Sequence, residues 1–179
     1  MDKEEYKQKR INTQRGILEK LKSILIKKNV VAIHQFGSFS KGTNDELSDR
    51  DLWFTFKDED LDDIISQQDE IFNEIGRVVI KYEPPQDAPL NGNYSMVIHE
   101  IDGDLYHVDY YFSAFSKTNI RPDATCVNGD DSLPRGEWIL DSEKPELNTP
   151  TSRIDFIICM SFIGIKYVVR PVDRSKAGL

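Results

Sequence analysis

Cysteine is scarce in this chain, and long apolar runs are missing. Two cysteines, Cys126 and Cys159, stand among 179 residues, too few for a disulfide framework. The longest apolar run, residues 156–165, is about half the length that a transmembrane helix requires. No basic and apolar leader segment opens the chain. We therefore expect a soluble, cytoplasmic protein that contacts no membrane.

Basic charge is also low. Lysine and arginine number 23 against 31 aspartates and glutamates, a formal net charge of −8. Nucleic-acid phosphates attract basic surfaces, so this balance argues against a long nucleic-acid partner and suits a small or cationic one. The patterns Gly-x-x-x-x-Gly-Lys-Ser/Thr, Gly-x-Gly-x-x-Gly and Gly-x-Ser-x-Gly are absent from the sequence. Walker-type ATPase, dinucleotide oxidoreductase and α/β-hydrolase functions therefore lose their usual support.

Hydrophobic periodicity and turn residues predict an α+β fold, a mixed β-sheet backed by helices. Apolar residues at helical spacing predict helices over residues 2–28, 58–75 and 152–170. Alternating or continuous apolar runs predict strands over residues 30–36, 51–56, 77–82, 94–101, 105–112 and 137–140. A hairpin turn is expected at residues 102–104 and irregular structure at residues 113–135.

The stretch that says most about chemistry is a glycine-serine pair followed by two aspartates. Gly37 ends a predicted strand, and its missing side chain lets a phosphate approach the backbone. Ser38 adds a hydroxyl and a backbone N–H, and Lys41 offers a cation nearby. Asp49 and Asp51 lie two residues apart, so alternation along a strand places both carboxylates on one face. Such oxygen ligands suit Mg²⁺ and the phosphates bound to it.

A third carboxylate is expected at Asp109, which lies among apolar neighbours in a predicted strand. Burying an acidic side chain there is costly unless it binds something. The Asp-x-Asp pattern occurs four times, at 49/51, 58/60, 60/62 and 102/104, so the pattern alone carries no weight. In the sequence, the pair at 49/51 is distinguished by the Gly-Ser turn before it. Lys41 fits an exposed loop lysine equally well, and Ser38 also fits a helix N-cap.

The three histidines, His34, His99 and His107, each fall in a predicted strand without a cysteine at metal-ligand spacing. We therefore expect packed histidines and no zinc site. His107 lies on the same strand face as Asp109, which leaves open a supporting role beside the acidic residues.

At these residues the sequence resembles the nucleotidyltransferase superfamily related to DNA polymerase beta, over about residues 30–112. That family has a Gly-Ser pair, a spacer, an Asp-x-Asp pair and a later acid on another strand. The resemblance implies a nucleotidyltransferase catalytic domain over residues 1–150. It implies a site made of Gly37, Ser38 and Lys41 for ATP or another nucleoside triphosphate, and of Asp49, Asp51 and Asp109 for Mg²⁺. Asp109 would be either a third metal ligand or the general base.

The C-terminal part resembles one branch of that superfamily. Residues 137–141 resemble a late strand of aminoglycoside and lincosamide adenylyltransferases, which continue into a helical domain. Residues 152–170 resemble the first helix of such a domain, so we assign residues 151–179 to its start. We expect the apolar face of this helix to be covered by further chain or by a second copy in a homodimer.

The resemblance implies transfer of AMP or another nucleotidyl group to a hydroxyl of a small acceptor, such as an aminoglycoside or lincosamide antibiotic. One alternative is a protein-modifying nucleotidyltransferase of a toxin–antitoxin system, against which the long N-terminal helix argues. Another is a nucleotide-binding module without turnover, against which the presence of all three acids argues.

Overall fold

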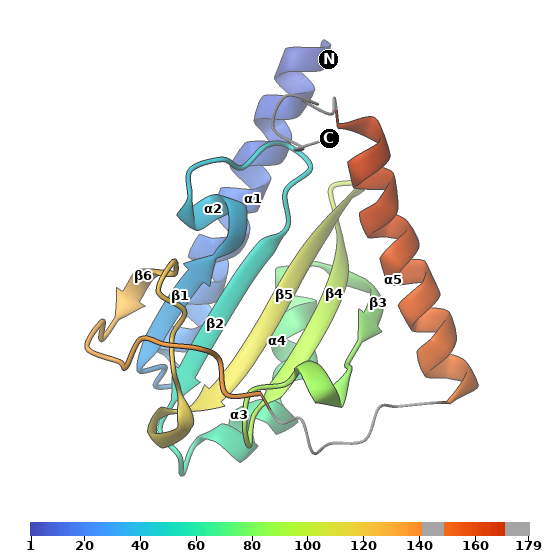
Figure 1. The fold of residues 1–179 in the computed structure, drawn as a ribbon. Helices are drawn as coiled ribbons and strands as arrows, with labels where there is room; N and C mark the ends of the chain where they lie inside the picture. Colours follow the sequence, from blue (N-terminus) through green and yellow to red (C-terminus); the bar gives the residue numbers. More distant parts are fainter. Residues whose placement is uncertain (141–148, 171–179) are drawn as a thin grey trace, which may run out of the picture.

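A mixed β-sheet with helices packed on it organises the chain (Figure 1). The computed structural model describes residues 1–140 and 149–170. Within these residues the sheet has six strands in the order β3-β4-β5-β2-β1-β6. The strands are β1 (Ala32–Phe36), β2 (Arg50–Phe56), β3 (Arg77–Tyr82), β4 (Asn93–Ile101), β5 (Asp104–Ala114) and β6 (Thr125–Gly129). The helices are α1 (Lys3–Ile26), α2 (Gly37–Ser40), α3 (Leu61–Ser66), α4 (Gln68–Ile75) and α5 (Pro150–Val169), with 3₁₀ turns η1 (Pro85–Asp87) and η2 (Phe115–Lys117).

The two strands in the middle of the sheet, β2 and β5, run parallel, whereas the other neighbouring pairs are antiparallel. β4 and β5 form the predicted hairpin, and Asp102 and Gly103 in its turn have positive φ angles of 52° and 80°. The predicted α+β fold is confirmed. Because β2 and β5 are neighbours, residues that are far apart along the chain meet in the middle of the sheet.

One face of the sheet is covered by α1, α3 and α4. Its core includes Leu21 and Leu25 of α1, Phe54 of β2 and Phe72 of α4, all fully buried. Phe54 also lies 5.4 Å, between ring centroids, from Phe112 of β5. Burial of these large apolar side chains is the main stabilising contribution on this face.

The opposite face carries an aromatic cluster and helix α5. Trp53 and Tyr111 stack with their ring centroids 5.4 Å apart, and Trp138 packs against both at 5.0 Å. Cys159 of α5 is fully buried in the same cluster. Since Trp53 follows Asp51 by two residues in β2, strand alternation puts Asp51 on this face too.

Helix α1 begins at a capping box and packs along the sheet. The Asp2 carboxylate accepts from the Glu5 N–H at 2.9 Å, and the Glu5 carboxylate accepts from the Asp2 N–H at 2.9 Å. These bonds satisfy backbone donors that lack a partner within the helix. Further along, Gln14 is 1% exposed, and its Nε2 donates to the Ser48 carbonyl at 2.7 Å. α1 therefore also holds the loop that precedes β2.

The single helix predicted for residues 58–75 is wrong in one respect, because two helices, α3 and α4, replace it. They meet at Gln67, whose φ and ψ angles of −97° and 2° leave the helical range. Ile64, Ile71 and Ile75 stay in helical phase across the break, so their spacing does not reveal it. Gly76 ends α4, as predicted.

Residues 113–135, predicted as irregular, contain β6, which pairs antiparallel with β1. Val127 is the sole aliphatic residue among the five of β6, and so short and polar a segment gives little strand signal. The prediction of irregular structure there is wrong.

The strand predicted for residues 137–140 is also wrong. The structure has one isolated bridge in its place, between Pro89 and Leu140. Trp138 packs into the aromatic cluster, which accounts for the apolar character that suggested a strand. Asp141, the last residue of the resemblance there, lies outside the described residues.

Helix α5 confirms the predicted C-terminal helix and leaves much apolar surface exposed. Ile157, Ile165 and Val168 are 60%, 62% and 85% exposed. Covering of this surface by further chain or by a second copy stays a prediction. In the described parts of the chain, no helix combines the length and apolarity that a membrane span requires.

We expect Phe54→Ala to lower the free energy of unfolding by about 3–5 kcal/mol, because it empties a fully buried aromatic volume. Urea titration followed by circular dichroism measures the loss. Val79→Ala, which truncates a 45% exposed side chain on edge strand β3, is the control and should cost less than about 1 kcal/mol. Equal losses in the two variants would contradict this assignment of the core.

Candidate functional site

Three aspartates converge where β2 meets β5. The parallel register pairs Asp51 directly with Asp109. Asp49 lies immediately before β2, which begins at Arg50. Asp109 is 7% exposed, whereas 32% of the Asp49 side chain is open to solvent. The structure therefore brings together the three acids that the sequence singles out, with Asp109 buried and Asp49 partly open to solvent.

A tight turn after β1 packs against Asp51. The chain leaves β1 at Phe36 and enters α2, a single helical turn that begins with Gly37. Gly37 has a φ angle of 68°, and a Cβ atom there would lie 2.1 Å from Asp51 Oδ2, so glycine is required. Ser38 Oγ is buried and has no hydrogen-bond partner in the described part of the chain. A bound ligand would satisfy this hydroxyl.

Two basic side chains and a tyrosine contact the aspartates. His107 Nδ1 lies 3.3 Å from Asp49 Oδ2, and His107 Nε2 lies 3.1 Å from Asp109 Oδ1. Lys166 Nζ, on α5, lies 2.9 Å from Asp49 Oδ2 and 3.2 Å from His107 Nδ1. The Tyr94 hydroxyl donates to Asp109 Oδ1 at 2.7 Å. Asp49 and Asp109 are thus held by neighbours from β4, β5 and α5.

The carboxylates perturb one another's protonation. Burial, followed by the negative charges of Asp109 and Asp49, raises the pKa of Asp51 to about 7. Burial also acts to raise the pKa of Asp49, but contacts with His107 and Lys166 outweigh it and lower that pKa. Burial acts to lower the pKa of His107, yet Asp109 and Asp49 raise it to about 9, so the imidazole is protonated at neutral pH. Binding of a cation relieves such crowding of negative charge.

Arg50 secures the start of β2 from the opposite face of the strand. It is 3% exposed, its Nε donates to the Gln14 carbonyl at 3.0 Å, and its Nη1 donates to Gln35 Oε1 at 2.8 Å. Its guanidinium carbon lies 3.5 Å from the centre of the Phe39 ring. These contacts tie α1, β1 and α2 to the strand that carries Asp51.

The sequence left two roles open for Lys41, a phosphate contact or an exposed loop lysine, and two for Ser38, a phosphate contact or a helix N-cap. The Lys41 side chain is 54% exposed, and its Nζ lies 3.2 Å from Asp123 Oδ2. This position fits the exposed loop lysine, and a phosphate contact stays a prediction. Ser38 lies inside α2, where Phe36 occupies the N-cap position, so the N-cap interpretation of Ser38 is wrong.

Sequence reasoning missed Lys166 and Tyr94. Lys166 is 6% exposed, and its charge in a mostly apolar helix is the signal that would have found it. A tyrosine such as Tyr94 is common in strands and gave no signal. Arg170 adds a second contact from the C-terminal end of α5, donating to Asp45 at 2.8 and 2.9 Å. Figure 1 shows this end of α5 near the loop that precedes β2.

We expect Lys166→Met to loosen the C-terminal half of α5, because the ammonium that joins the helix to Asp49 and His107 is lost. Hydrogen exchange followed by mass spectrometry should show faster amide exchange over residues 160–169. Ile165→Met, at a 62% exposed neighbour on the same helix, is the matched control and should leave exchange unchanged. Wild-type exchange rates in Lys166→Met would contradict the anchoring role of this side chain.

The segment that carries the turn and the first two acids matches a known family. The family model described as polymerase beta, nucleotidyltransferase matches residues 19–87. This match includes Gly37, Asp49 and Asp51, and it ends before Asp109. No curated protein matches the chain with significant similarity. Residues 19–87 are therefore similar to the nucleotidyltransferase domains of the polymerase beta superfamily.

Proposed function

We propose that the protein is a Mg²⁺-dependent nucleotidyltransferase that moves AMP, or another nucleoside monophosphate, from a nucleoside triphosphate to a hydroxyl of a small acceptor. The observation that carries this proposal is the close packing of the Gly37 turn against Asp51, which itself stands beside Asp109. A turn open to phosphate, next to paired carboxylates, is what metal-assisted phosphoryl chemistry requires. The family match, which covers Gly37 and Asp51, supports the same conclusion.

The donor set suits magnesium and a triphosphate. Asp49, Asp51 and Asp109 offer carboxylate oxygens, the ligands that Mg²⁺ prefers, and their mutual repulsion falls when a cation binds. The unpartnered Ser38 hydroxyl and the absent side chain at Gly37 suit an incoming phosphate. Bound magnesium would neutralise charge on the triphosphate and orient its α-phosphate.

The reaction requires one bond to form and one to break at the α-phosphorus. The acceptor oxygen forms a bond to the α-phosphorus. The bond between the α-phosphorus and the oxygen that bridges to the β-phosphate breaks, and pyrophosphate leaves. The acceptor hydroxyl gives up its proton to a base, and Asp109 is the candidate for this base. The alternative role of Asp109 is that of a metal ligand. Tyr94 and His107 both contact Asp109 Oδ1, and so fix the orientation of the carboxylate for either role.

A cleft beside Lys166 offers a place for the acceptor. It has a volume of about 330 Å³, and its lining includes Arg10 of α1, Asp104 at the start of β5 and Phe162 of α5. Small-molecule sites commonly measure about 300–1,000 Å³. Lys166 lines this cleft and also contacts Asp49, so the cleft and the acids are adjacent. We assign the acceptor to it, with an aminoglycoside or a lincosamide as the acceptor class to test first.

Two other functions differ from this one in measurable ways. A protein-modifying nucleotidyltransferase would transfer labelled AMP to a protein and ignore small acceptors. A module without turnover would bind ATP and release no pyrophosphate. The position of all three acids at one point favours an enzyme, because a module that binds nucleotide does not need them together.

Comparing the variants Gly37→Ala and Gly42→Ala separates the effect of backbone strain from the effect of a methyl group that contacts Asp51. Both glycines have positive φ angles, 68° and 66°, so alanine costs about 1–2 kcal/mol at either position. An added Cβ would meet Asp51 at Gly37 and would meet nothing within 4 Å at Gly42. We expect Gly37→Ala alone to abolish Mg²⁺-dependent ATP binding in isothermal titration calorimetry. Equal ATP affinity in the two folded variants would contradict the assigned turn.

We expect the wild-type protein to release pyrophosphate from ATP when Mg²⁺ and one acceptor from an aminoglycoside and lincosamide panel are both present. Asp51→Asn should lower this rate at least about 100-fold, because it removes a carboxylate that holds the metal. Asp62→Asn, at an exposed position on α3, is the matched control and should keep the wild-type rate. If the wild type binds ATP but releases no pyrophosphate with any member of the panel, the antibiotic acceptors are rejected.

A further inference from the structure

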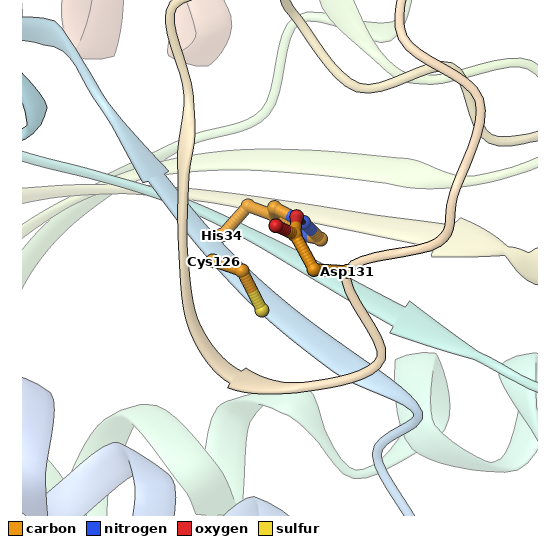
Figure 2. A group of neighbouring side chains, drawn as sticks. All are labelled: His34, Cys126 and Asp131. Carbon is orange, nitrogen blue, oxygen red and sulfur yellow. Dashed lines mark hydrogen bonds and ion pairs between the residues drawn. The ribbon is translucent and has the colours of Figure 1, made fainter.

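Three side chains with metal-binding atoms meet at the β1–β6 edge of the sheet (Figure 2). His34 on β1 pairs directly with Cys126 on β6 in the antiparallel register, so their side chains share one face. Asp131 follows β6 closely, and its Oδ1 lies 3.3 Å from His34 Nε2. One potential ligand atom from each of the three residues lies within 4.8 Å of the other two. Nitrogen, sulfur and oxygen donors therefore gather at one point.

The backbone around β6 brings these side chains together. The register of β1 and β6 shifts immediately before His34, an irregularity of the kind that redirects side chains in a sheet. Gly129 ends β6 with a φ angle of 85°, and a Cβ atom there would lie 2.1 Å from the Val31 carbonyl oxygen. The Asp130 N–H donates to that carbonyl at 3.1 Å. The turn that returns Asp131 to His34 is therefore fixed against β1.

His34 is a buried imidazole whose hydrogen-bonding capacity is not used up. Its side chain is 1% exposed, and its Nδ1 has no partner among the residues that the structure describes. Nε2, the ring nitrogen that faces Asp131, is the one placed to bind an ion.

Cys126 and Asp131 are both partly exposed to solvent. Cys126 is half-buried, and the Asp131 side chain is 58% exposed. Arg135 donates to Asp131 Oδ1 at 2.5 Å, and outer contacts of this kind commonly orient a carboxylate at a metal site. The Cys126 thiol donates weakly to the Asn128 carbonyl, with sulfur and oxygen 3.4 Å apart.

We propose that His34, Cys126 and Asp131 bind one transition-metal ion, with Zn²⁺ as the expected ion. Thiolate and imidazole ligands favour zinc over magnesium or calcium, and three protein ligands leave a fourth tetrahedral position for water. Tetrahedral zinc ligands lie about 3.5 Å apart, so a cluster within 4.8 Å contracts by about 1 Å on binding. The Cys126 sulfur exchanges its proton for the metal, and the proton passes to solvent. The ion then ties β6 and the turn after it to β1, the strand that leads into Gly37.

Cobalt(II) titration of the reduced 179-residue chain tests this site, with Mg²⁺ in excess to occupy the aspartate site. A cobalt–thiolate bond gives a charge-transfer absorption band in the near ultraviolet, which carboxylate and imidazole ligands do not give. We expect the band to saturate at about one Co²⁺ per chain and to disappear when Zn²⁺ displaces the cobalt. Cys126→Ser should abolish the band, and Asp131→Asn should weaken Co²⁺ binding at least about tenfold.

Two matched controls remove the other thiol and the neighbouring carboxylate. Cys159→Ala and Asp130→Asn should keep both the band and the Co²⁺ affinity of the wild type, with folding of every variant checked by circular dichroism. The proposal is overturned if the folded wild type shows no thiolate band. It is also overturned if Cys159→Ala loses the band, or if Asp131→Asn binds Co²⁺ as tightly as the wild type.

Discussion

Negative charge gathered at one point is the constraint on which the rest of the structure depends. The parallel pairing of β2 with β5 sets Asp51 beside Asp109, and the loop before β2 adds Asp49. Repulsion and burial raise the pKa of Asp51 to about 7, while protonated His107 and the Lys166 ammonium offset the charge of the other acids. Such a site is stable with cations close by, and in the proposed function a bound divalent metal ion would supply the positive charge.

The scaffold holds the acids from several elements at once. α1 reaches the loop before β2 through Gln14, and Arg50 joins α1 and β1 to the start of that strand. On the other side, α5 contributes Lys166 and Arg170 to the same region. Fixed supports of this kind keep reacting groups in place, which is what phosphoryl transfer requires of a protein. The acids in the segment that resembles the nucleotidyltransferase family, residues 19–87, therefore depend on α5 and β5, which lie outside that segment.

Features of short range could be predicted from the sequence, and pairings of long range could not. Periodicity located α1, β3 and the β4–β5 hairpin, and one short motif located Gly37 and Asp51, because each pattern lies within one or two elements. Lys166 lies 117 residues from Asp49, and no spacing connects them. Long-range pairing also explains why the sequence shows no sign of metal ligands around the histidines. Their spacing argued against zinc, but the β1–β6 register supplies the cysteine opposite His34 that spacing cannot show.

A crystal structure with Mn²⁺ and a non-hydrolysable ATP analogue would test most directly whether the aspartates and the Gly37 turn form a metal–nucleotide site. We expect an anomalous manganese peak about 2 Å from carboxylate oxygens of Asp49 and Asp51. The triphosphate should lie against Gly37 and Ser38. A manganese peak away from these carboxylates, or an analogue bound on another part of the surface, would contradict the assigned site.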